Sequence, residues 1–190
     1  MNKNKKTLTN LFKLGNYNTD KYDLGYLEYF YDDFFAKLKK SSITMMEIGV
    51  CYGGSIKLWK DYLSPQSKIY AGEINNFQHI DGTYSVIGDM YSDEQVSKFS
   101  DNYFDLIIDD GPHSFESFTL LIERYFLKIK KRGTLVVEDI IHVEWVEPLV
   151  KLAESVGYSN IEILNMSEKQ KTQELLDRWK GGLYILNITK

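Results

Sequence analysis

The chain has 190 residues, 43% hydrophobic and 26% charged, which is typical of one soluble globular domain and not of a disordered chain. Its net charge of −4 disfavours a general nucleic-acid binder, and no apolar run approaches the roughly 20 residues that span a membrane. The single cysteine, Cys51, excludes an intrachain disulfide and a cysteine-based zinc site. We therefore expect a protein of the reducing cytoplasm, with neither a membrane nor nucleic acid as partner.

The first 40 residues are predicted to form a helical arm or cover. Residues 1–20 are polar, with a short helix expected near Leu8–Leu14. Between residues 22 and 39, four apolar side chains at four-residue steps indicate a helix: Tyr26, Phe30, Phe34 and Leu38. We expect one domain over residues 1–190, with 1–40 as the arm and 41–190 as the core.

From residue 43 onward, apolar runs alternate with helical patterns. The runs expected to be strands are 43–50, 68–74, 84–88, 104–109, 133–139, 160–166 and 182–189. The segments expected to be helices are 55–63, 93–100, 114–130 and 144–157. This alternation predicts an α/β fold with a mostly parallel seven-stranded sheet covered on both faces. The last two strands lack a clear long crossover, so we expect an antiparallel ending.

Nearly every predicted strand delivers a carboxylate to the same edge of the sheet. These residues are Glu47, Glu73, Asp89, the pair Asp109–Asp110 and the pair Glu138–Asp139. Sheets of this kind bind ligands beyond the carboxyl ends of their strands. The functional site is therefore expected at this edge.

The turn after the first strand, EIGVCYGGS (residues 47–55), is rich in glycine, which allows a ligand to approach the backbone closely. Cys51 stands where a dinucleotide-binding G-x-G-x-x-G turn has its second glycine, so a nicotinamide cofactor is disfavoured. Glu73 follows at the distance of an acidic residue that holds two ribose hydroxyls. A tight connection without a ligand is the structural alternative.

Over residues 19 to 140 the sequence resembles the class I S-adenosylmethionine (SAM)-dependent methyltransferases. It is most similar to a branch with metal-dependent sugar O-methyltransferases of macrolide biosynthesis and cephalosporin-methyltransferase-like proteins. Thr19-Asp20-Lys21 and Tyr26 match the opening motif of that branch, although Leu24 replaces its histidine. The resemblance implies a Rossmann-like three-layer sandwich with its last strand antiparallel, and SAM as cofactor. The residues it implies for SAM binding are Thr19, Lys21, Tyr26, Glu47, Gly49, Tyr52, Gly53, Ser55, Glu73, Asp89 and Asp109.

The stretch FDLIIDDGPHSF (residues 104–115) ends a buried strand on two aspartates. Neighbouring residues on a strand point to opposite faces, so Asp109 and Asp110 are expected to have different roles. Asp110, Glu138 and Asp139 should converge, and three bare carboxylates require either protonation or a cation. Hard oxygen ligands suit Mg²⁺. The resemblance implies that Asp110, Glu138 and Asp139 hold Mg²⁺, with Asp110 and His113 as catalytic residues and His113 as the base.

The sequence thus predicts a SAM-dependent, Mg²⁺-dependent O-methyltransferase acting on a sugar hydroxyl of a glycan, a nucleotide-sugar or a glycosylated metabolite. One alternative is a metal-independent methyltransferase acting on another small molecule. Another is a SAM-binding partner subunit without catalysis. Because no large insertion covers the cleft, the arm or a neighbouring subunit must do so, and we expect a homo-oligomer.

Overall fold

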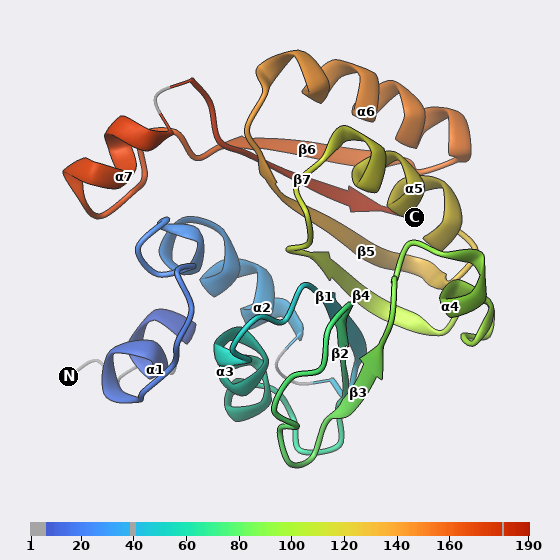
Figure 1. The fold of residues 1–190 in the computed structure, drawn as a ribbon, viewed down its shortest axis with the longest axis horizontal. Coiled ribbons are helices and arrows are strands. Elements are labelled where there is room, and N and C mark those ends of the chain that lie inside the picture. The colour runs from blue at the N-terminus through green and yellow to red at the C-terminus, as the bar shows by residue number, and fades with distance from the viewer. Residues whose placement is uncertain (1–6, 39–40, 180) are drawn as a thin grey trace.

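The computed structural model describes residues 7–38, 41–179 and 181–190. Its sheet has the strand order β3-β2-β1-β4-β5-β7-β6 (Figure 1). The strands are β1 (Thr44–Ile48), β2 (Lys68–Glu73), β3 (Tyr84–Ile87), β4 (Phe104–Asp109), β5 (Ile129–Ile140), β6 (Asn160–Asn165) and β7 (Tyr184–Thr189). Neighbours among β1 to β5 pair in parallel, whereas β7 is antiparallel to both β5 and β6. The predicted mostly parallel sheet with an antiparallel last strand is confirmed.

Helices cover both faces of the sheet (Figure 1). They are α1 (Leu8–Leu14), the π-helical turn η1 (Leu27–Tyr31), α2 (Asp32–Leu38), α3 (Gly54–Tyr62), α4 (Asp93–Ser97), α5 (Phe115–Tyr125), α6 (Val143–Val156) and α7 (Gln173–Arg178). One core packs α1, η1, α2 and α3 on the face that carries Leu106 and Ile108 of β4. The second packs α4, α5 and α6 on the face that carries Ile107. Successive side chains of a strand point to opposite faces of the sheet, so helices pack on both faces and the fold has three layers.

The predicted helix over residues 22–39 differs from the observed structure in its regularity. The turn η1 interrupts the four-residue spacing, so Tyr31 and Phe35 are fully buried while Phe34 is only partly buried. A π-helical turn is a local insertion that rotates the following side chains around the axis. Tyr31 thereby lies against the carboxyl end of β5, where its hydroxyl contacts Glu138. The end of the predicted segment, residue 39, lies outside the described residues.

The connection between β6 and β7 packs against the N-terminal segment. The backbone amide of Lys171 donates a hydrogen bond to the carbonyl of Asp23, and its ammonium pairs with Glu28. Residues 21–31 are therefore held between this connection and the sheet. Within the described residues, no helix is long and apolar enough to cross a membrane.

Candidate active site

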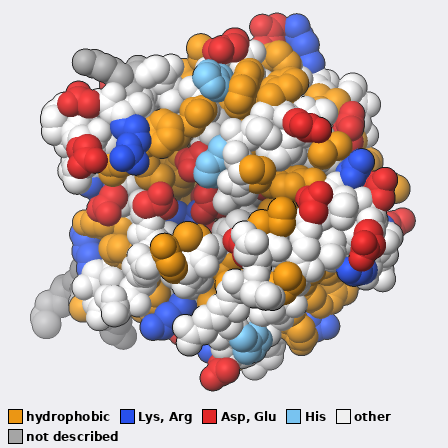
Figure 2. Space-filling model, viewed as in Figure 1, with side chains coloured by type: hydrophobic (Ala, Val, Ile, Leu, Met, Phe, Trp, Pro, Cys, Tyr) orange, Lys and Arg blue, Asp and Glu red, His pale blue; other side chains and the backbone are white. Residues whose placement is uncertain are grey.

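A cavity of about 980 Å³ opens at the carboxyl ends of the parallel strands. This volume suits a nucleotide-sized ligand. Figure 2 shows acidic side chains gathered beside a histidine near the middle of one face. The residues expected from the sequence that line the cavity are Thr19, Gly49, Tyr52, Ser55, Glu73, Asp89, Asp110, His113 and Asp139. The structure brings these nine residues together from separate segments.

The turn after β1 needs glycine for a reason of space. Gly49 has a φ of +86°, and a Cβ there would lie 1.8 Å from the carbonyl oxygen of Asp110. The amide of Asp110 donates a 2.8 Å hydrogen bond to the carbonyl of Ile48. Gly53, also at positive φ, is the N-cap of α3. The turn after β1 therefore lies directly against the turn after β4, and a side chain at Gly49 would separate them.

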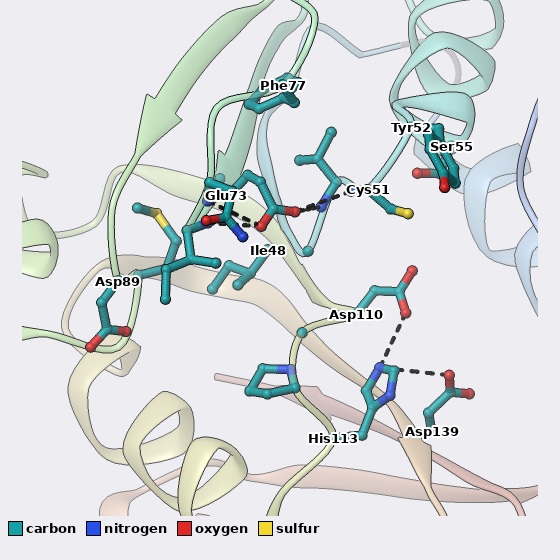
Figure 3. Close-up of a pocket in the computed structure, with 18 of the residues that line it drawn as sticks. Ile48, Cys51, Tyr52, Ser55, Glu73, Phe77, Asp89, Asp110, His113 and Asp139 are labelled. Atoms are coloured by element: carbon teal, nitrogen blue, oxygen red, sulfur yellow. Dashed lines mark hydrogen bonds and ion pairs between the residues drawn. The ribbon is translucent and has the colours of Figure 1, made fainter.

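Glu73 fixes the far side of this turn. Its Oε2 accepts hydrogen bonds from the amides of Val50 (2.9 Å) and Cys51 (3.1 Å), and its Oε1 accepts one from Ile74 (2.9 Å) (Figure 3). Cys51 adopts a φ of 49°, which is uncommon for a residue with a side chain. Glu73 thus lines the cavity while its carboxylate holds the turn in shape. Asp89 lies on the β3 side, where it accepts from the amide of Tyr91 at 2.9 Å.

A buried lysine lies beneath the cavity wall. Lys21 is 1% exposed, and its Nζ lies 2.8 Å from Asp110 Oδ2 and 3.6 Å from Glu47 Oε1, in contact also with Glu138. Burial alone would lower the pKa of Lys21, but the charges of Asp110, Glu138 and Glu47 outweigh it and raise the pKa well above its usual range. The side chain is therefore a permanent positive charge. It offsets part of the negative charge of the carboxylates that surround it.

Two tyrosines of the N-terminal segment also donate hydrogen bonds to buried carboxylates near Lys21. Tyr31 donates a hydrogen bond to Oε1 of Glu138, and Tyr26 donates one to Oδ1 of Asp139. Lys21 occupies the other oxygen of Glu138. Glu138 is fully buried and does not line the cavity, but it lies close to Asp110, because both carboxylates contact the ammonium of Lys21. The strand is irregular here, since its register with β7 shifts between Val137 and Ile140 and Asp139 has a φ of 55°.

Five further residues that were expected at the cofactor site are buried and do not contribute to the lining of the cavity. Lys21, Tyr26, Glu47, Gly53 and Asp109 do not line the cavity. Glu47 is fully buried and accepts a 2.6 Å hydrogen bond from Trp59 Nε1. Sequence reasoning missed the roles of Tyr31 and Trp59, since both had only the apolar spacing of helix residues. No motif in the sequence distinguished them.

Asp109 and Asp110 have the different environments expected of neighbours on a strand. Asp109 is fully buried and accepts a hydrogen bond from the hydroxyl of Tyr91. Burial raises the pKa of Asp109 to about 7, against the smaller opposing effect of Tyr91. The side chain of Asp110 is 23% exposed and faces the cavity. Burial would raise its pKa, but Lys21 and His113 outweigh burial and lower it.

His113 lies between two carboxylates (Figure 3). Its Nε2 is 3.3 Å from Asp110 Oδ1 and 3.6 Å from Asp139 Oδ2. Burial lowers the pKa of His113, but the hydrogen bond to Asp110 and the charge of Asp139 outweigh it, so the pKa is raised. Both His113 (φ 51°) and Asp139 (φ 55°) have positive φ. Such conformations cost energy and concentrate at functional sites.

Asp110, His113 and Asp139 form a group that fits a metal ion. One ligand atom of each lies within 4.8 Å of the others. Burial raises the pKa of Asp139, and repulsion by the charge of Asp110 adds to this effect. A divalent cation that accepts carboxylate oxygens and an imidazole nitrogen would relieve this repulsion. The arrangement can therefore bind a cation at the cavity wall.

Comparisons with known proteins identify relatives that are named as O-methyltransferases. The chain is 29% identical to mycinamicin VI 2''-O-methyltransferase of Micromonospora griseorubida, over 64% of this chain and 34% of the relative. It is 27% identical to demethylmacrocin O-methyltransferase of Streptomyces fradiae, over 60% and 32% respectively. A third relative is the 8-demethyl-8-alpha-L-rhamnosyl tetracenomycin-C 2'-O-methyltransferase of Streptomyces olivaceus, 25% identical over 68% and 37%. The chain thus spans about a third of the length of these relatives.

Solved structures give the same result. The MycE methyltransferase from the mycinamycin biosynthetic pathway in complex with Mg and SAH superposes with a TM-score of 0.60 and 30% identity, over 71% of this chain and 37% of that one. The CurJ carbon methyltransferase, at 16% identity, supports the fold alone, with a TM-score of 0.61 over 95% of this chain and 57% of that one. No family model matches the chain. The chain has the Rossmann-like fold of SAM-dependent methyltransferases, its three relatives are named as O-methyltransferases, and the resemblance seen in the sequence is confirmed.

Proposed function

We propose that the chain is a SAM-dependent, Mg²⁺-dependent O-methyltransferase that acts on a hydroxyl of a sugar-bearing small molecule. The observation that carries this proposal is the group Asp110, His113 and Asp139, which stands at the wall of a nucleotide-sized cavity. The relatives support it, because those three are named as O-methyltransferases and one name includes a rhamnosyl group. The neighbouring MycE structure contains both Mg and SAH.

In this proposal the cofactor lies along the turn after β1. Gly49, Tyr52 and Ser55 line the part of the cavity suited to its amino-acid portion, and Glu73 and Asp89 line the part suited to ribose and adenine. Lys21, Tyr26, Glu47, Gly53 and Asp109 support this wall from behind. Their effect on SAM binding is therefore expected to be indirect, through the shape of the turns that they hold.

Asp110 and Asp139, with Glu138 as the third carboxylate that the resemblance implies, would hold Mg²⁺, which usually keeps several waters beside its protein ligands. When bound, Mg²⁺ would supply Lewis-acid chemistry at the acceptor hydroxyl, and SAM would supply the methyl group. His113 is the proposed base, and it must be neutral to accept the hydroxyl proton. Asp110 and Asp139 orient the ring from Nε2 and stabilise the imidazolium that results. The protein's contribution is alignment and electrostatics.

We also propose that residues 1–190 act as one domain, with the N-terminal segment as part of the site, because Lys21 and Tyr26 contact residues that follow β4 and end β5. A second copy of the chain is proposed to cover the acceptor side. Tyr52 and Ile74, at the cofactor end of the cavity rim, are 82% and 64% exposed, which favours a partner surface that extends over them as well. The free, exposed Cys51 fits a reducing, cytoplasmic environment. Light scattering of the purified protein tests the homo-oligomer.

The direct test is methyl transfer from isotopically labelled SAM to a panel of acceptors, with Mg²⁺ or with excess chelator. The panel should contain nucleotide-linked sugars, glycosylated polyketides and catechols. We expect labelled product only with a sugar-bearing acceptor and only with Mg²⁺. Full turnover in chelator would favour the metal-independent alternative. SAM binding by calorimetry without product from any acceptor would favour the non-catalytic subunit.

A further inference from the structure

We propose that β6 pairs with β6 of a second copy of the chain across a twofold axis through Ile163, so that the two sheets join into one. This inference goes beyond the proposed methyl transfer, because none of the described residues that line the cavity belongs to β6. β6 is the outermost strand on its side of the sheet, next to β7 (Figure 1). The backbone groups on its outer edge therefore need either water or another strand as partner.

The edge at β6 lacks the features by which proteins prevent pairing with another chain. Those features include a very short edge strand, lysine, proline and a β-bulge. β6 has six residues without lysine or proline, and it pairs with β7 without a register shift. Its single charged residue, Glu162, accepts a 3.1 Å hydrogen bond from Asn187 of β7. The opposite edge strand, β3, has only four residues, so we expect β6 and not β3 to accept a further strand.

Backbone hydrogen bonds decide which residues of β6 face outward. The amide of Met166 donates to the carbonyl of Leu183, which continues the register of β6 with β7 by one residue. In an antiparallel pair, hydrogen-bonded residues alternate with residues whose amide and carbonyl point away from the partner strand. The amides and carbonyls of Ile161, Ile163 and Asn165 therefore point away from β7, to the outer edge.

The outward residues complement their own copy when the axis passes through Ile163. An axis perpendicular to the sheet keeps each face of the strand on its own side, so Ile163 lies opposite Ile163 of the second copy and Ile161 lies opposite Asn165. The outward residues can then exchange hydrogen bonds with the second copy. Ile163, which is 50% exposed, gains a β-branched partner. An axis through Glu162 would instead place two carboxylates opposite each other, which is unfavourable.

This pairing reverses the direction of the strands from one sheet to the other. The carboxyl ends of β1 and β4, where the cavity opens, then lie at opposite ends of the assembly in the two copies. The contact leaves both cavities accessible, so it is separate from the cover proposed for the acceptor side. The occupant that fits this edge is a second copy, because the segment is complementary to itself in hydrogen bonding and in side chains.

Cross-linking through a new cysteine tests the register. In a Cys51→Ser background, Ile163→Cys gives each copy a single cysteine. Opposite residues of a hydrogen-bonded antiparallel pair have Cα atoms about 5.5 Å apart, which a disulfide can span. We expect mild oxidation to join most of this variant into covalent dimers. Asn160→Cys in the same background is the matched control, because the two copies of this exposed position would lie about 20 Å apart.

Light scattering of the full chain tests the pairing itself. Ile163→Lys places two ammonium groups beside the axis, so we expect its assembly to have half the mass of the wild-type assembly. Ile87→Lys, on the edge strand β3, is the control and should keep the wild-type mass, because Ile87 is also exposed, at 42%. Circular dichroism verifies that both variants are folded. Should Ile163→Lys fail to fold, the cross-linking comparison decides alone.

A wild-type protein that is monomeric at the highest concentration measured overturns the inference, and leaves the edge to a strand of another protein. Equal cross-linking of Ile163→Cys and Asn160→Cys also overturns it, as does an unchanged mass of folded Ile163→Lys. Methyl transfer by the wild type is assayed separately. A monomer that transfers methyl groups overturns only this inference, whereas a β6-paired assembly that transfers none overturns only the proposed function.

Discussion

The hydroxyl of Tyr26 donates a hydrogen bond to the carboxylate of Asp139, which stands 113 residues further along the chain. Tyr26 is fully buried and Asp139 is 6% exposed, so the hydroxyl has little access to water as an alternative partner. The contact connects the N-terminal segment to the end of β5. It also fixes one oxygen of a residue whose other oxygen faces His113.

Tyr26→Phe should therefore harm both the fold and the site. Loss of the hydroxyl leaves a buried carboxylate oxygen without a donor, which costs about 1–3 kcal/mol. We expect the free energy of unfolding in urea to fall by that amount and methyl transfer to decrease more than SAM affinity. Tyr29→Phe is the control, because Tyr29 is 50% exposed. Equal stability of the two variants would contradict the role of the contact.

The pH dependence of turnover tests His113. Its pKa is raised because the hydrogen bond to Asp110 and the charge of Asp139 outweigh burial. A base works only when neutral, so turnover should rise with pH through the raised pKa, above the ordinary 6.5, and then level off. Bound Mg²⁺ would oppose the proton and shift this rise to lower pH.

His113→Gln should lower kcat by about 10²–10⁴-fold and abolish that rise, with little change in acceptor KM. His79→Gln is the control, because His79 contacts Ser85 and is exposed. A His113→Gln protein with the wild-type pH profile would remove His113 from the role of base.

The sheet could be predicted because its signals are local. Continuous apolar strands, glycine-rich turns and alternation with helices determined the order of elements without any long-range contact. The predicted boundary between α5 and β5 was wrong. The helix was expected to reach residue 130 but ends at Tyr125, and β5 begins at Ile129. Lys130, Lys131 and Arg132 gave that segment a polar appearance, and they lie in an irregular stretch between Ile129 and Thr134, which both pair with β4.

The buried layer of the site could not be predicted in the same way. Convergence of Asp110, Glu138 and Asp139 followed from parallel strand order, but the presence of a buried lysine beside them did not. Lys21 lies 89 residues from Asp110 and 117 from Glu138, and only the folded N-terminal segment brings it there. Burial of a lysine depends on partners from three strands, and no local pattern of the sequence encodes that.

Gly49 offers a test of the contact between the turns after β1 and β4. Gly49→Ala should destabilise the fold by roughly 2 kcal/mol or more, because alanine is strained at φ +86° and its Cβ would meet the carbonyl oxygen of Asp110. Gly181→Ala is the matched control, since a Cβ there meets nothing within 4 Å. Urea unfolding of both variants gives the comparison, and similar midpoints would contradict the close approach. We expect SAM affinity to fall only in Gly49→Ala.

From the raised pKa of Asp109 we expect the stability of the fold to decrease as pH rises towards neutrality. Burial raises its pKa from 3.8 to about 7, so between these values the folded protein keeps a proton that the unfolded chain has released. The free energy of unfolding therefore falls as pH rises from about 4 to 7, because the folded state must ionise a buried carboxyl group. Above pH 7 the group is ionised in both states and the loss is complete. Asp109→Asn cannot ionise, and its amide oxygen can still accept from Tyr91. Its stability relative to the wild type should thus increase between pH 4 and 8, by at most roughly 4 kcal/mol. Urea unfolding at both pH values measures this difference, with exposed Asp101→Asn as the control. A constant difference between Asp109→Asn and wild type across the range would show that Asp109 ionises normally in the fold.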